Sequence, residues 1–341
     1  MMTDATIPGR ADLTRIADRF LLYRSPGSDR VASFAEDVRA GLDMQPKRLS
    51  PKYFYDDLGS AIFEAICHLP EYDLARNESE IFDEHADDIV SALGEPLELI
   101  ELGSGSGKKT RLLIEAILRR QRELVYHPVD ISAGALAASV GVLLAAYDRL
   151  SVSAYASDYF DVLAARRIET TCRALVLFLG SNIGNYAPVQ ARRLLHAIAS
   201  ACRPGDALLL GADLKKPARE HEAAYDDPTG VTAAFNKNLL ARINRELGGD
   251  FDLRAFDFKA SYDAGRGSVE SYLIAKSAQR VRIALLERDY AFAAGEPIHM
   301  ESSYKFSIED LIVLANETGF RFAQEWTDAG GRFLVCLLVR T

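Results

Sequence analysis

The chain has 341 residues, of which 48% are hydrophobic and 26% charged, so it can bury a core sufficient for one large domain or two modest ones. Its formal net charge of −9 argues against nucleic acid as a main partner, because phosphate contacts need clustered lysine and arginine. We therefore expect a small-molecule substrate.

Cysteine spacing and hydropathy indicate a cytoplasmic protein. Cys67, Cys172, Cys202 and Cys336 lie far apart and form no Cys-x-x-Cys pair, and the first residues of the chain lack an apolar signal core. The most apolar segment, residues 133–147, is rich in alanine and too short to span a bilayer. We expect reduced thiols and no membrane contact. The sequence does not give the oligomeric state and is compatible with a monomer.

The N-terminal part is mixed polar and charged. Helical patches are expected at residues 12–23 and 31–42, followed by a stretch with two prolines at 45–51 that cannot continue a long helix. A further helix is expected over residues 77–93. We expect residues 1–75 to contribute to a substrate-binding lobe.

A glycine-rich segment at residues 97–110, Leu-Glu-Leu-Ile-Glu-Leu-Gly-Ser-Gly-Ser-Gly-Lys-Lys-Thr, is typical of a strand, a tight turn and a helix start. Such a turn binds nucleotides, because glycine lets the backbone approach a ligand and the helix start offers free N–H groups. Leu102 stands where a Walker loop needs its first glycine, and Lys108 where a dinucleotide fingerprint needs its third. With Glu101 just before Gly103, the segment best fits an S-adenosylmethionine enzyme.

Strands and helices alternate from this segment onward, as in a parallel doubly wound sheet. Strands are expected at residues 97–102, 124–129, 152–156, 174–179 and 207–212. The helices between them are expected near residues 109–119, 133–148 and 188–202.

The alternation stops after the fifth strand. Residues 215–247 are expected to be largely helical, and residues 251–286 to form two or three strands. A helix at 307–318 and strands at 321–326 and 333–339 fit the end of a seven-stranded methyltransferase sheet.

We therefore predict an α/β fold: a doubly wound, seven-stranded, Rossmann-like methyltransferase sheet with a second, smaller α+β substrate lobe. The methyltransferase domain is expected to comprise residues 76–214 and 301–341, with residues 215–300 as an inserted substrate-binding lobe.

Acidic residues follow the second and third predicted strands, and ligands of such sheets gather at the carboxyl ends of the strands. Asp130 is expected to accept the adenosine ribose hydroxyls, and Asp158 to lie beside the adenine amino group. Taken singly, each of these acids could instead be a helix cap or a loop residue.

A series of motifs in order carries a family resemblance. The motifs are Tyr53-Phe54-Tyr55-Asp56, Leu69-Pro70-Glu71-Tyr72, Glu101-Leu102-Gly103-Ser104-Gly105 with Lys109-Thr110, Leu179-Gly180-Ser181-Asn182-Ile183-Gly184-Asn185, Ala224-Tyr225-Asp226-Asp227, Gly230-Val231-Thr232-Ala233-Ala234-Phe235-Asn236 and Glu301-Ser302-Ser303-Tyr304-Lys305-Phe306. From about Leu49 to the end, the chain closely resembles the L-histidine Nα-methyltransferases of ergothioneine biosynthesis. The resemblance implies S-adenosylmethionine as methyl donor and three successive methylations of the α-amine of free L-histidine, giving hercynine. Related fungal enzymes act on tryptophan.

The resemblance also implies roles for individual residues. The S-adenosylmethionine site would comprise Gly103, Lys109, Asp130, Asp158 and Tyr159. The substrate amine would lie near Tyr55, its carboxylate near Asn185 and Tyr225, and its imidazole near Tyr72, Glu301 and Ser303. A carboxylate at Glu301 would accept a hydrogen bond from an imidazole N–H, which favours histidine, although an indole also has an N–H. Without the motif context, Tyr225 could be a helix-end aromatic residue and Glu301 a solvated strand acid.

The expected chemistry is in-line displacement by a neutral amine, in which positioning contributes most. Tyr55 is the candidate to take the amine proton, directly or through water, and loss of the proton to solution is the alternative. No metal is expected, since the six histidines show no pair at ligand spacing.

Two departures from the family pattern leave other substrates open. Ser271 stands where mycobacterial-type relatives have a methionine lining the substrate side chain, and residues 73–76 replace the usual second tyrosine and proline. Another aromatic amino acid, such as tryptophan or tyrosine, is therefore an alternative substrate, and a non-catalytic S-adenosylmethionine-binding module is a remote one. Enzymes that methylate nucleic-acid amines are disfavoured, because residues 185–188 have the wrong order for their Asn-Pro-Pro-Tyr loop.

Overall fold

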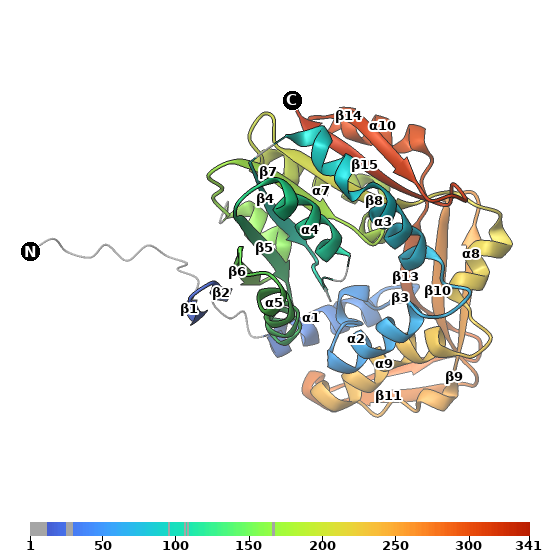
Figure 1. Cartoon of the computed structure of the whole chain (residues 1–341). Helices are drawn as coiled ribbons and strands as arrows, with labels where there is room; N and C mark the ends of the chain where they lie inside the picture. The colour runs from blue at the N-terminus through green and yellow to red at the C-terminus, as the bar shows by residue number, and fades with distance from the viewer. Residues whose placement is uncertain (1–11, 25–29, 95, 106, 108, 166–167) are drawn as a thin grey trace, which may run out of the picture.

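The computed structural model describes residues 12–24, 30–94, 96–105, 107, 109–165 and 168–341. It consists of a large twisted sheet with helices on both faces and a smaller lobe of helices and strands against one end of that sheet (Figure 1). Apolar residues of the lobe and of one face of the sheet belong to a single buried cluster, so the two parts share a core.

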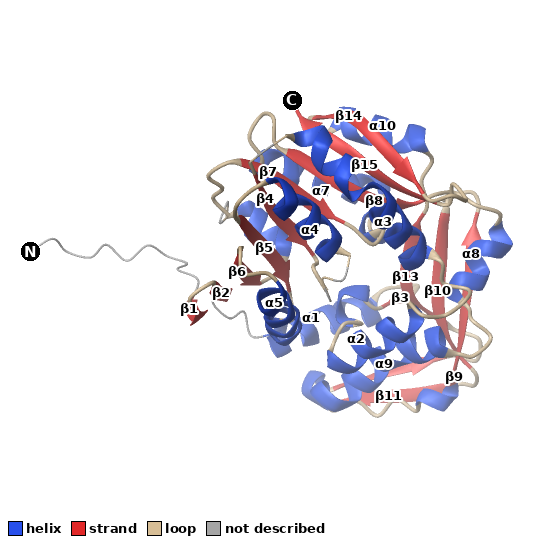
Figure 2. Ribbon diagram, viewed as in Figure 1, coloured by secondary structure: helices blue, strands red, loops and turns tan. Residues whose placement is uncertain are grey.

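The large sheet has the strand order β1-β2-β6-β5-β4-β7-β8-β15-β14 (Figure 2). Its parallel centre consists of β4 (Leu97–Leu102), β5 (Leu124–Asp130), β6 (Leu150–Ala156), β7 (Arg173–Phe178) and β8 (Ala207–Asp213). The antiparallel pair β15 (Phe333–Arg340) and β14 (Phe320–Thr327) completes the sheet. The predicted seven-stranded doubly wound sheet is thus confirmed.

Helices cover both faces of the large sheet, because successive side chains of each strand point to opposite faces and both sets are apolar. In β4, Leu99 belongs to one buried cluster and Ile100 to the other. The first face is covered by α3 (Leu74–Leu93), α4 (Thr110–Arg120) and α5 (Ala133–Ala146). The second face is covered by α6 (Tyr159–Ala164), α7 (Pro188–Ala201) and α10 (Ile308–Glu317).

The N-terminal prediction of a helix over residues 12–23 is wrong. These residues form the hairpin β1 (Asp12–Ala17) and β2 (Phe20–Arg24), and β2 extends the large sheet by pairing in parallel with β6. Phe20 and Leu22 are buried at alternate positions, which is the two-residue period of a strand rather than a helix. The edge of β6 supplies the partner that the sequence alone did not reveal.

The smaller lobe contains a four-stranded sheet in the order β3-β13-β10-β9. Its strands are β3 (Lys47–Arg48), β9 (Phe256–Asp263), β10 (Ser268–Ala275) and β13 (Pro297–Tyr304), and β11 (Gln279–Ile283) and β12 (Arg288–Phe292) form a separate hairpin. Its helices are α1 (Arg30–Asp43), α2 (Asp57–Ile66), α8 (Ala218–Tyr225) and α9 (Val231–Leu247). Within the residues described, none of the helices has the length and apolar character needed to cross a bilayer.

Candidate active site

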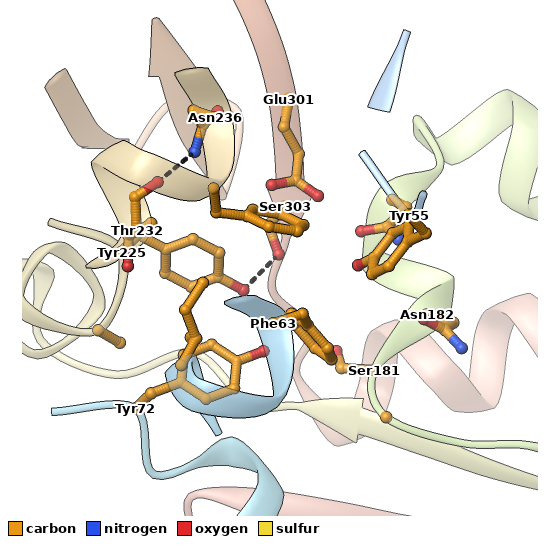
Figure 3. A pocket seen from close by; sticks show the side chains of 15 residues that line it. Tyr55, Phe63, Tyr72, Ser181, Asn182, Tyr225, Thr232, Asn236, Glu301 and Ser303 are labelled. Atoms are coloured by element: carbon orange, nitrogen blue, oxygen red, sulfur yellow. Dashed lines mark hydrogen bonds between the residues drawn. The ribbon is translucent and has the colours of Figure 1, made fainter. Parts of the chain in front are cut away.

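A pocket lies where the small lobe meets the carboxyl ends of the central strands (Figure 3). It is lined by all six side chains predicted to contact the substrate: Tyr55, Tyr72, Asn185, Tyr225, Glu301 and Ser303. They come from segments far apart in the chain: the residues just before α2 and just before α3, the 3-10 helix η2 (Asn182–Asn185), the end of α8, and β13. The fold therefore brings together residues that the sequence connected only through motif order.

Strand β13 carries two of these side chains at alternate positions. Glu301 and Ser303 point to the same side of the strand because side chains in a strand alternate between faces. The register with β10 shifts between Ser271 and Tyr272, whose partners on β13 are Glu301 and His299. One extra residue, Met300, therefore forms a bulge directly before Glu301, and bulges re-aim the side chains that follow them.

Glu301 has no hydrogen-bond partner among the described residues, and its carboxylate points into the pocket (Figure 3). Desolvation by the surrounding protein raises its pKa from 4.5 to about 7, against the opposing effect of Lys305. A carboxylate without a partner in a pocket is an acceptor available to a ligand N–H.

The raised pKa makes folding stability depend on pH. The folded state binds the Glu301 proton more tightly than the unfolded state, so this group's contribution to stability falls as pH rises from about 4.5 to 7. Relative to Glu301→Gln, the wild-type free energy of unfolding is expected to fall by about 2 kcal/mol between pH 5 and pH 7. Urea unfolding of both proteins at these pH values measures the difference, and parallel profiles would contradict the assignment.

Two hydroxyl groups meet beside Glu301. The Tyr225 hydroxyl lies 2.8 Å from Ser303 Oγ (Figure 3). Lys305 Nζ donates to both oxygens, at 2.9 Å to Tyr225 and 3.0 Å to Ser303. Lys305 lies in the motif at residues 301–306, but the sequence gave no sign that its ammonium would be buried behind the pocket.

Aromatic rings form one wall of the pocket. Tyr55 contacts Phe63 and Phe235 at ring-centroid distances of 5.5 and 5.6 Å, and Tyr72 contacts Phe63 at 6.2 Å and Tyr225 at 6.1 Å. Phe63 was not predicted as a site residue, since its place in an amphipathic helix equally suits a core position. Phe235, together with Thr232 and Asn236, lies in a motif that carried the resemblance, so a signal for these lining residues was present.

The glycine turn follows β4 with a backbone that favours glycine. Gly103, Gly105 and Gly107 have φ of +77°, +50° and +66°. Asp130, at the end of β5, accepts the Gly105 N–H at 3.0 Å and the Ser132 N–H at 2.9 Å. The turn and the acid predicted to bind the ribose are thus held together, and carboxylate lone pairs remain for a ligand.

Beneath the turn, Glu101 is buried and does not face a ligand. It accepts hydrogen bonds from Thr110 Oγ1 at 2.7 Å and from the Tyr126 hydroxyl. Burial raises its pKa to about 7. The acid before the first glycine therefore supports the turn from inside the protein.

Lys109 forms an ion pair with Glu78 of α3, a fully buried residue that the sequence analysis did not single out. The other Glu78 oxygen accepts the N–H of Gly180, two residues after β7, at 2.7 Å. A Cβ on Gly211 would approach Glu78 Oε1 to 2.2 Å, so the carboxylate fills the space that this glycine leaves open. Glu78 thus links Lys109, at the end of the glycine turn, to the segment that follows the neighbouring strand β7.

The last two predicted cofactor residues follow β6. Asp158 caps α6 by accepting the Phe160 N–H at 2.8 Å, and the Tyr159 hydroxyl is hydrogen-bonded to that of Tyr186. All five predicted cofactor residues therefore lie at or just after the carboxyl ends of the neighbouring strands β4, β5 and β6. Backbone amides, open glycine positions and an acid at the end of β5 form a donor and acceptor set that fits S-adenosylmethionine.

The predicted role of Asp130 gives a direct test. Asp130→Ala removes an acceptor for the ribose and leaves the Gly105 and Ser132 amides without their partner. The Kd for S-adenosylmethionine is expected to rise about tenfold, since a hydrogen bond to a charged group contributes about 1.5 kcal/mol or more. Calorimetric titration measures it, with Asp148→Ala as an exposed control. An unchanged Kd would remove Asp130 from the cofactor site.

The two departures from the family pattern have structural counterparts. Ser271 is buried beside Glu301 across the β10–β13 pair but is not among the residues that line the pocket. Asp73 forms ion pairs with Lys216 at 3.3 Å and Arg332 at 3.0 Å. In the part of the chain that the structure describes, no three His, Cys, Asp or Glu side chains are grouped so as to hold a metal ion.

Comparison with known proteins agrees with this geometry. The chain is 43% identical over 306 residues to a histidine N-alpha-methyltransferase of Mycolicibacterium smegmatis, covering 89% of this chain and 94% of the relative. It is 40% identical to the protein of the same name from Mycobacterium tuberculosis, with the same coverage. Ergothioneine biosynthesis protein 1 of Schizosaccharomyces pombe is 28% identical, over 82% of this chain and 37% of that longer protein.

The family model described as "histidine-specific methyltransferase, SAM-dependent" matches residues 34–340, which include every residue of the pocket and of the glycine turn. The chain therefore belongs to the S-adenosylmethionine-dependent histidine-specific methyltransferase family.

Proposed function

We propose that this enzyme methylates the α-amine of free L-histidine three times, giving hercynine, in the cytoplasm and as a step of ergothioneine biosynthesis. The observation that carries the proposal is the unpartnered Glu301 carboxylate beside the Tyr225–Ser303 hydroxyl pair, in a pocket next to the glycine turn. The names of the bacterial relatives that are at least 40% identical support the same substrate.

In this proposal the pocket recognises both ends of the amino acid. Glu301 accepts an imidazole N–H, with Ser303 and Tyr72 beside the ring. Asn185 and Tyr225 donate to the carboxylate. Because the lone carboxylate acceptor pairs with a heteroaromatic N–H, a purely hydrocarbon ring would leave Glu301 unsatisfied, which costs affinity.

Gly103, Lys109, Asp130, Asp158 and Tyr159 would hold S-adenosylmethionine, which when bound supplies an electrophilic methyl group. Tyr55 is proposed to orient the amine. Burial raises the pKa of its hydroxyl well above the ordinary value, so the neutral phenol is the form present at neutral pH. Its oxygen can accept an N–H of the amine and fix its direction, and the amine proton then leaves through water to solution.

The aromatic wall supports repeated methylation of one nitrogen. Each methyl transfer leaves the nitrogen larger and less able to donate hydrogen bonds, and the final product carries a fixed positive charge. Faces of Tyr55, Phe63 and Phe235 can accommodate such a group through cation–π attraction without hydrogen bonds.

We further propose that the large sheet with its helices binds the methyl donor and that the smaller lobe binds the substrate. Residues 76–214 and 301–341 would form the methyltransferase domain and residues 215–300 the substrate lobe, with residues 1–75 contributing to the latter. Strand β13 continues to Tyr304 within the sheet of the lobe, which moves this boundary to just after that strand. The contacts of α1 and α2 with lobe elements support this for residues 30–75, whereas residues 12–24 belong to the large sheet.

The test is incubation of the protein with S-adenosylmethionine and histidine, tryptophan or tyrosine in turn, followed by mass spectrometry. Histidine is expected to gain three methyl groups. A gain on tryptophan or tyrosine alone would favour the alternative substrate. Cofactor binding without any methylated amino acid would overturn the enzymatic proposal and leave a binding module.

A further inference from the structure

Behind the pocket lies a cation that the proposed binding scheme does not use. Lys305 directly follows β13, and its side chain has no exposed surface. Its Nζ lies 2.9 Å from Oδ2 of Asp213, an equally buried residue at the end of β8. A buried ammonium is costly unless it is paired, so its position beside the pocket calls for an explanation.

The hydrogen bonds of Lys305 determine what the neighbouring hydroxyls can do. An ammonium only donates, so the oxygens of Tyr225 and Ser303 both accept from it. These two oxygens lie 2.8 Å apart and share one of their two hydroxyl protons. One proton therefore remains to point elsewhere, and the pair offers a single oriented donor.

Two lysines and two aspartates meet behind the pocket. Asp213 lies 2.9 Å from both Lys305 and Lys216, so one carboxylate is shared between two ammonium groups. His221 lies close to the same carboxylate, but burial and the nearby Lys305 lower its pKa to about 4, which keeps it neutral. Asp73 balances Lys216 from the other side. The two carboxylates thus balance the two ammonium groups, and the Lys305 ammonium is the charge that contacts Tyr225 and Ser303.

We infer that Lys305 is a positioning residue for recognition of the substrate carboxylate, holding the Tyr225 and Ser303 hydroxyls so that their free proton is donated to an anion. The Lys305 ammonium does not contact the ligand itself, because the Tyr225 and Ser303 hydroxyls lie between them. This arrangement attracts a carboxylate while keeping the ammonium away from the reacting amine. The inference rests on the proposed function only in requiring that the substrate be an amino acid.

The experiment removes the charge from the protein and the carboxylate from the ligand in turn. Dissociation constants are measured by calorimetry for histidine and histamine with wild type and Lys305→Met, in the presence of S-adenosylhomocysteine. Histidine is expected to bind about tenfold more weakly to the variant, and histamine within about twofold, since only the first ligand has the anion. Equal weakening of both ligands, or no weakening of histidine, overturns the inference.

Lys216→Met is the matched control. It removes the other lysine that pairs with Asp213 but touches neither Tyr225 nor Ser303, so the histidine-to-histamine ratio should stay near that of wild type. If Lys305→Met does not fold, Lys305→Met combined with Asp213→Asn removes both buried charges and is tested in the same way. A further check uses the Tyr225→Phe background. There, Lys305→Met should raise the Kd for histidine by a smaller factor than it does in the wild-type protein.

The design separates this inference from the choice of substrate. If tryptophan or tyrosine proves to be the methylated amino acid, the ratio is measured with that amino acid and its decarboxylated amine. A preserved effect of Lys305→Met then supports the inference although histidine was the wrong substrate. Failure of the wild type to prefer any amino acid over its amine overturns carboxylate recognition itself.

Discussion

Glu301→Ala is expected to raise the KM for histidine about a hundredfold, while the Kd for S-adenosylmethionine changes less than twofold. The variant deletes the carboxylate that lines the pocket and has no hydrogen-bond partner among the residues that the structure describes. A charge-assisted hydrogen bond in a desolvated site contributes about 1.5–3 kcal/mol, and each 1.4 kcal/mol is tenfold. Steady-state kinetics and calorimetry measure the two quantities.

Two further variants sharpen this test. Glu301→Gln keeps the shape and one acceptor oxygen but not the charge, so its KM should lie between those of wild type and Glu301→Ala. Glu325→Ala removes an exposed carboxylate on β14 and should leave both constants unchanged. Equal loss of histidine and cofactor binding in Glu301→Ala would show that Glu301 acts on the fold rather than on the substrate.

Glu78→Ala is expected to lower the free energy of unfolding by about 3 kcal/mol and to weaken cofactor binding at least tenfold. The carboxylate is fully buried and satisfies both Lys109 and the Gly180 N–H. Its removal leaves an ammonium and an amide without acceptors, a loss moderated because the Lys109 side chain is 28% exposed. Urea unfolding and calorimetric titration measure the two effects.

The same helix supplies the control for Glu78. Glu84→Ala changes an exposed glutamate on α3 and should alter stability by less than about 0.5 kcal/mol. Glu78→Gln retains an acceptor for Gly180 and should recover part of the stability but less of the cofactor affinity. Normal cofactor binding in a folded Glu78→Ala protein would argue that Lys109 does not need this partner.

The parts of the fold that follow from local pattern were predictable. Buried strands such as β7 and β8 are continuous apolar runs, and α7 places its buried residues at helical spacing, so both classes of element were identified close to their observed bounds. The N-terminal hairpin was not, because its two short strands depend on pairing with β6, a partner far away in the sequence.

The same distinction applies to the site. Glycines with positive φ and acids at strand ends carry local signals, so Gly103 and Asp130 could be proposed from the chain alone, and Glu301 from a motif. Glu78 and Lys305 could not be assigned, since a charged residue in a helix or after a strand is normally solvated. Only the fold shows that both are buried beside the residues they hold.

Strand β13 also bears on how this enzyme family could change its preference. The two side chains that line the pocket, Glu301 and Ser303, alternate with two that are hydrogen-bonded elsewhere. Ser302 donates to Glu270 at 2.7 Å, and the Tyr304 hydroxyl accepts from Arg266 at 3.1 Å. The residues that line the pocket and the residues that fix the strand therefore occupy alternate positions of one short segment. Substitutions at Glu301 and Ser303 can therefore change which amino acid the pocket accepts, while Ser302 and Tyr304 keep the hydrogen bonds that hold the strand.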